Sequence, residues 1–77
     1  MSDAARATST NLIAVYDVAL DEVYGYLLHR CGHVEIAQDL TSETFVAAAR
    51  AVRDGSVYEV NVAWLIGIAR HKLVDHW

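Results

Sequence analysis

Three polar residues at helical spacing are the first feature of this 77-residue sequence that could bind a partner. Asp39, Ser42 and Glu43 stand at positions i, i+3 and i+4, so a helix would present them on one face. Carboxylates in such a patch can accept charge-assisted hydrogen bonds from a basic partner. The same spacing is also typical of a solvated helix face, and the three residues alone do not decide between these two interpretations.

A second group of residues could contact nucleic acid. Its members are Ser56, Tyr58, Asn61, Gly67, Arg70 and His71. Basic side chains can donate hydrogen bonds to phosphates or base edges, and an aromatic ring can stack on an unpaired base. Structural roles also fit these residues, because Asn61 could only cap a helix, Tyr58 could only cover a loop and Arg70 could be a solvated charge.

The sequence contains no pattern typical of a catalytic or metal centre. It has no nucleophile with an oriented base, no phosphate-binding glycine loop and no second ligand pair at zinc-like spacing. His29, Cys31 and His33 alternate along the chain, so a helix would point them to different sides. We therefore expect no enzyme activity, no metal and no cofactor.

The charge of the chain is acidic and unevenly distributed. The formal net charge is −4, with seven acids and two bases in residues 1–43 and three acids and four bases in residues 44–77. This balance argues against a chain that grips duplex DNA unaided, and it suits a domain with two different partners. A single cysteine and the lack of a signal peptide or a long apolar run predict a cytoplasmic protein that does not bind membranes.

Apolar periodicity and the absence of proline predict an all-α, compact bundle of three to four helices. Residues 1–10 are expected to form a flexible tail, and Thr10 is expected to cap a helix over 11–31 that stops at Gly32. Further helices are expected over 34–53 and, after a cap at Asn61, over 62–77. Each expected helix has one buried stripe. In helix 11–31 the stripe is Leu12, Ile13, Tyr16, Leu20, Val23, Tyr24, Leu27 and Cys31. In helix 34–53 it is Ile36, Leu40, Thr44, Ala47, Ala48 and Ala51, and in helix 62–77 it is Val62, Leu65, Ile66, Ala69, Leu73 and His76.

Two stretches resemble region 2 of bacterial sigma factors of the extracytoplasmic-function subfamily. That family carries a run close to A-E-D-L-x-Q-E-T-F, and residues 37–45 read A-Q-D-L-T-S-E-T-F. About twenty residues later it carries W-L-x-x-I-A-R-N-x-x-x-D, and residues 64–75 read W-L-I-G-I-A-R-H-K-L-V-D. The resemblance covers residues 11–77, and the order and distance of the two motifs make it specific.

The resemblance implies a transcription initiation factor that binds core RNA polymerase and recognises and helps to melt the promoter −10 element. Its implied polymerase-binding residues, which would meet a coiled coil of the β′ subunit, are Asp39, Leu40, Ser42, Glu43 and Val46. Among them Leu40 is expected to pack more than to bind. The residues implied to contact the −10 element and the non-template strand are Ser56, Tyr58, Asn61, Gly67, Arg70 and His71. An anti-sigma factor is a further partner that the resemblance allows.

The sequence departs from the family at positions that matter for these contacts. Ser42 stands where the family has glutamine, and His71 stands where it has asparagine. The helical pattern also continues to Trp77 without a stop signal, which predicts that the chain was cut from a longer protein. The 77 residues themselves are not expected to include a second, −35-binding domain. A helical protein–protein interaction domain without DNA binding is the alternative interpretation.

Overall fold

The computed structural model describes residues 3–57 and 59–77, with side chains from residue 15 onward, and it contains three helices in this part of the chain. They are α1 (Asp3–Cys31), α2 (Val34–Arg53) and α3 (Val62–His76). No strand is present among the described residues. The predicted all-α class is therefore confirmed.

The predicted start of the first helix is wrong. α1 begins at Asp3, whereas the sequence predicted a cap at Thr10 and a first helical residue at position 11. Residues 3–7 are Asp, Ala, Ala, Arg and Ala, and alanine and arginine are strong helix formers that need no apolar period to be helical. Residues 1 and 2 lie outside the described part of the chain.

The predicted C-terminal ends of α1 and α2 are confirmed, and a glycine explains each of them. Gly32 has a φ of 70°, and its N–H donates to Leu28 O at 2.9 Å, as expected of a left-handed C-terminal cap. Gly55 has a φ of 72°, and the N–H groups of Gly55 and Ser56 donate to Val52 O and Ala51 O. This pair of bonds is the Schellman motif, which turns the chain away at the end of α2.

The core lies where all three helices meet. α1 contributes Ala19, Val23 and Leu27, which are fully buried. Half of the residues in the predicted stripes of α2 and α3 are buried, and the others are half-buried apart from His76, which is exposed. Ala37, Thr41 and Val52 are buried without having been predicted. The remaining buried members from α2 and α3 are Leu40, Thr44, Ala48, Leu65, Ala69 and Leu73.

Two threonines of α2 enter this core without leaving a polar atom unsatisfied. Thr41 Oγ1 donates to Ala37 O at 2.6 Å, and Thr44 Oγ1 donates to Leu40 O at 2.7 Å. Each hydroxyl thus bonds to the carbonyl one turn earlier in the same helix. Because the hydroxyls turn back onto α2, the methyl groups can pack against the neighbouring helices.

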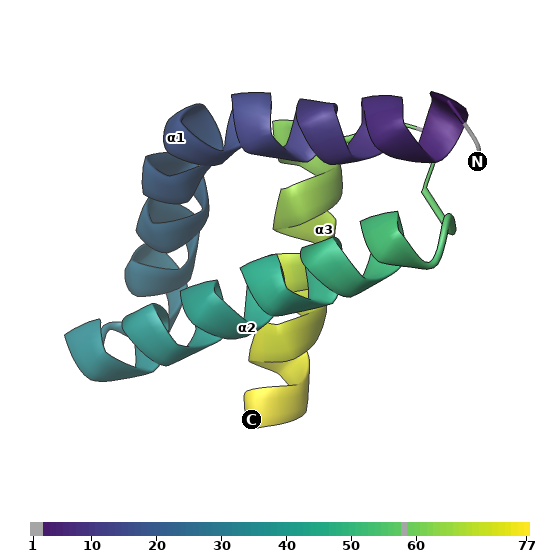
Figure 1. Cartoon of the computed structure of the whole chain (residues 1–77). Helices are drawn as coiled ribbons and strands as arrows, with labels where there is room; N and C mark the ends of the chain where they lie inside the picture. The colour runs from purple at the N-terminus through teal and green to yellow at the C-terminus, as the bar shows by residue number, and fades with distance from the viewer. Residues whose placement is uncertain (1–2, 58) are drawn as a thin grey trace.

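The arrangement leaves long stretches of helix surface open. Figure 1 shows that α1 bends part of the way along, so that its first part runs across the top and its second part descends beside α2 and α3. α2 crosses in front of α3, and the chain ends at the far end of α3. None of the helices that the structure describes has the length and apolar character needed to span a bilayer.

Candidate interaction surfaces

The structure exposes most of the predicted polar patch on α2. Asp39, Ser42 and Glu43 are all exposed and come from successive turns of the same helix. Val46 follows one turn later and is 51% exposed, so it adds apolar surface beside the carboxylates. We call these four residues the acidic face of α2. A partner could bury Val46 while it pairs with the carboxylates.

Leu40 does not belong to this surface. Its side chain is only 3% exposed and packs in the core between α2 and its neighbours. The fold therefore uses Leu40 to hold α2 in place, as its apolar character predicts, and not to touch a partner. Phe45 also packs, since its ring meets that of Tyr16 edge to face with centroids 4.9 Å apart.

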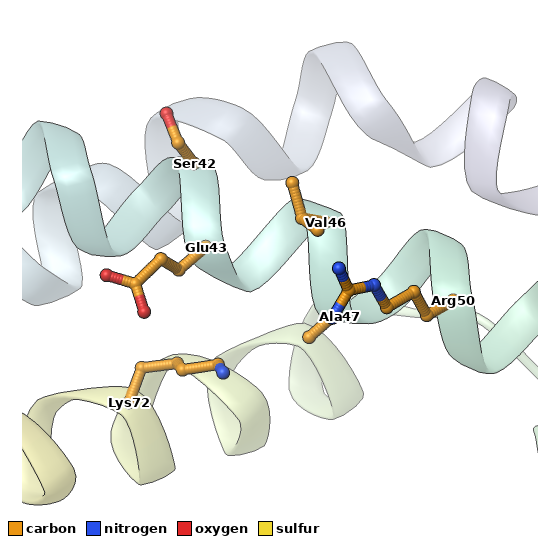
Figure 2. Close-up of a pocket in the computed structure, with 6 residues that line it drawn as sticks. All are labelled: Ser42, Glu43, Val46, Ala47, Arg50 and Lys72. Carbon is orange, nitrogen blue, oxygen red and sulfur yellow. The ribbon is translucent and has the colours of Figure 1, made fainter.

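A groove between α2 and α3 borders the acidic face. It has a volume of about 320 Å³ and is lined by Ser42, Glu43, Val46, Ala47, Arg50 and Lys72. Figure 2 shows Glu43 reaching from α2 toward α3, Lys72 rising from α3 on the facing side, and Arg50 lying along α2. The predicted acidic patch is therefore flanked by two cations.

Lys72 is the residue of this groove that sequence reasoning missed. Spacing along the chain offers Lys72 only one acidic partner, Asp75, three residues further along α3. In the structure Asp75 lies instead near His71, with Nε2 and Oδ2 3.9 Å apart. The packing of α3 across α2 brings Lys72 next to Glu43, and no local pattern along α3 carries that information.

The segment between α2 and α3 uses part of its polar groups for structure. Asn61 Oδ1 accepts a hydrogen bond from Trp64 N at 2.8 Å, which confirms the predicted helix cap. Ser56 Oγ donates to Ala51 O at 3.1 Å while the residue stays exposed. The amide nitrogen of Asn61 remains available at the surface. Tyr58 lies outside the described residues.

The exposed side of α3 carries the other predicted nucleic-acid residues. Gly67, Arg70 and His71 are exposed and lie opposite the buried stripe of the helix. A β-carbon built on Gly67 would meet nothing within 4 Å, so the packing of the domain does not require a glycine there. The surface thus combines the Arg70 guanidinium and the His71 ring, which lies 3.9 Å from Asp75, with a point where the helix backbone is open to close approach.

Among the described side chains no group of three or more histidine, cysteine or acidic residues could hold a metal ion. Cys31 is a free, half-buried cysteine whose sulfur lies 3.5 Å from His33 O. Trp64 is half-buried against the core, in keeping with a packing role.

The chain is an all-α domain with an acidic face on α2 and a basic, glycine-containing face on α3. The model of the family described as Sigma-70 region 2 matches residues 15–77. The chain belongs to this family and is a region 2 domain of the sigma factors of transcription initiation.

A curated relative supports the subfamily predicted from the motifs. The chain is 41% identical over 64 residues to the ECF RNA polymerase sigma factor BldN of Streptomyces coelicolor. The match covers 82% of this chain and 24% of that protein, so the chain spans about a quarter of the length of the curated relative. No solved structure matches the chain.

Proposed function

We propose that this domain binds core RNA polymerase through the acidic face of α2 and recognises the promoter −10 element through the α2–α3 segment and the exposed side of α3. The observation that carries the proposal is the exposure of Asp39, Ser42 and Glu43 together on one face. These positions fall in the first of the two sigma motifs, inside the matched residues 15–77. The relative BldN is named as a polymerase sigma factor, which agrees with this role.

The polymerase contact follows from the chemistry of the face. Two exposed carboxylates one turn apart can each pair with a basic side chain on a partner helix, and Val46 adds apolar area that the contact would remove from water. Ser42 carries a short hydroxyl where the family has glutamine, so its hydrogen bonds reach less far. Asp39 and Glu43 therefore carry most of the affinity.

The promoter contact rests on the second surface. Arg70 and His71 are exposed donors on α3. One turn earlier, Gly67 leaves the helix backbone uncovered at its own position. Ser56 and Asn61 are exposed in the preceding segment, where a base lifted out of the stack would be read. In this arrangement α3 holds phosphates and the segment 54–61 selects bases.

The polymerase contact is tested by charge reversal. Asp39→Arg and Glu43→Arg each replace an attractive pair with a repulsive one, so each should weaken binding to core polymerase by on the order of 1–3 kcal/mol. Binding is measured by titrating labelled domain with core polymerase at fixed salt, after circular dichroism has shown that each variant is folded. Glu22→Arg, an exposed site on α1, is the control with the same change in charge. Unchanged affinity in both patch variants would place the interface elsewhere.

The promoter contact is tested with the chain bound to core polymerase and a library of fluorescent single-stranded −10 probes. Exchanging residues 55–60 for the segment of another family member should change which bases are preferred. Arg70→Ala should instead weaken all probes by a similar factor, as the loss of a phosphate contact does. Arg53→Ala removes an exposed basic side chain at the end of α2 and serves as the control. If polymerase binds but no probe does, the domain is an interaction module without a DNA role.

A further inference from the structure

The groove beside the acidic face holds charges of both signs. Glu43 and Lys72 also line a second hollow, of about 270 Å³, together with Leu40, Asp75 and His76, so these two residues face one another along the α2–α3 boundary. Among the described side chains, ion pairs within 4.0 Å join only Arg53 to Asp54 and His71 to Asp75. Glu43 and Lys72 are thus neighbours that are not paired.

Lys72 is half-buried and lines the groove, and no carboxylate lies within 4.0 Å of its amine among the described side chains. Arg50 supplies a second cation to the groove from α2. A surface cation without a partner inside the domain is available to a partner outside it.

The mixture of charges limits what this groove can bind. A phosphate or a nucleic-acid strand would meet the cations but would be repelled by Glu43 and, one turn earlier, by Asp39. A purely basic segment would pair with the carboxylates but would be repelled by Lys72 and Arg50. A segment that carries both signs satisfies all four groups.

We propose that Lys72 is a second contact for core polymerase, and that the occupant of the groove is a polymerase helix with an acidic residue beside its basic ones. The proposal rests on the proposed function and deepens it. Glu43 and Arg50 are seven residues apart on α2, which is two helical turns, or about 10 Å along the axis. The partner helix therefore presents a basic side chain near Glu43. It presents an acidic side chain within about two turns of that basic residue, where Arg50 and Lys72 can reach the acidic group.

The alternative role for Lys72 predicts the opposite sign in a binding experiment. If the partner surface is wholly basic, Lys72 only opposes binding, and its replacement by an acid strengthens the complex. If the partner carries an acid at the groove, the same replacement weakens the complex. The direction of the change therefore decides between the two.

The experiment measures the affinity of the chain for core RNA polymerase with Lys72→Glu, Lys72→Gln and the control Arg53→Glu. Arg53 is exposed at the end of α2, does not line the groove, and gives the same change in net charge as Lys72→Glu. Relative to Arg53→Glu, we expect Lys72→Glu to weaken binding about 5-fold or more, and Lys72→Gln to weaken it about 2-fold relative to the unmodified chain.

Each outcome has one meaning. Binding by Lys72→Glu that equals or exceeds that of Arg53→Glu overturns the proposal. If Lys72→Glu does not fold, Lys72→Gln, which keeps most of the aliphatic stem, is used instead. Weaker polymerase binding by Lys72→Gln than by the unmodified chain then supports the proposal, and equal or stronger binding overturns it. Glu43→Arg is measured in parallel: its failure to weaken binding would refute the polymerase role of the α2 face itself, whereas a loss with Glu43→Arg and none with Lys72→Glu would refute only the role of Lys72.

Discussion

At the scale of single residues, Asn61 shows how one side chain can serve both the fold and a binding surface. Its Oδ1 accepts from Trp64 N, while the residue as a whole is exposed and its amide nitrogen is not needed for the cap. The first atom satisfies one of the N–H groups that the start of α3 leaves without an intrahelical partner. The second is free to donate to a base or a phosphate.

The two roles of Asn61 can be separated by substitution. Asn61→Ala should lower the free energy of unfolding by about 1 kcal/mol, because the cap is lost, whereas Asn61→Ser should leave stability almost unchanged. Urea denaturation followed by circular dichroism measures both. Either variant removes the amide donor, so both should weaken −10 probe binding to the same extent if the donor is used. Equal stability of the alanine and serine variants would show that the cap contributes nothing.

Residue types alone predicted most of the acidic face but not its surroundings. Asp39, Ser42 and Glu43 could be placed together because helical spacing fixes which side chains share a face. Lys72 could not be placed beside them, because its position depends on how α3 crosses α2. Leu40 lies within the same motif, yet its burial follows from its apolar character, and a motif does not separate residues that bind from residues that pack.

At the scale of helices, the glycines mark different constraints. Gly55 has a positive φ and ends α2, so a side chain there would be strained. Gly67 lies inside α3 with nothing within 4 Å of an added β-carbon. The fold needs the first glycine and is weakened by the second, because a glycine within a helix costs backbone entropy.

Replacing each glycine by alanine should therefore change stability in opposite directions. Gly67→Ala should raise the free energy of unfolding by about 0.5–1 kcal/mol, and Gly55→Ala should lower it by about 1 kcal/mol. Thermal and urea unfolding of the two variants provides the comparison. If Gly67→Ala is more stable and yet binds −10 probes less well, the open backbone of α3 is part of the DNA surface. A loss of stability in Gly67→Ala would contradict the open surroundings found at that position.

The helix boundaries show which signals a sequence carries about its elements. α2 and α3 were predicted within a residue or two, because Gly55 and Asn61 stop and start helices for local reasons. The start of α1 was misplaced, because residues 3–7 have helix propensity without apolar periodicity. Periodicity reports which helix face is buried, so it does not detect a helical segment that lacks an apolar stripe.

At the scale of the whole molecule, charge separates the two partner surfaces. The chain carries a net charge of −4, with Asp39 and Glu43 on α2 and Arg70 and His71 on the exposed side of α3. Within α3, Lys72 faces the groove while Arg70 faces away from the core and the groove. Of the six lysines and arginines, Arg50 and Lys72 line the groove and only Arg70 lies on the exposed side of α3, which limits the number available to a nucleic acid there.

This division leads to the prediction that the domain alone binds duplex DNA weakly and with little dependence on salt. Each phosphate neutralised by a basic side chain adds about −0.9 to the slope of log affinity against log salt concentration. Proteins with about 6–10 such contacts therefore have steep slopes. The exposed side of α3 offers Arg70, and His71 when it is protonated, so we expect a slope of about −2 or shallower. Fluorescence anisotropy with a labelled duplex at several salt concentrations measures this slope. The reference is the same duplex bound to the complex of the domain with core polymerase.

A steep slope and tight, sequence-independent binding by the free domain would mean that it binds DNA through basic side chains other than those of α3. A shallow slope would leave polymerase as the partner that brings α3 to the promoter, because a surface with so few cations cannot hold the duplex without it.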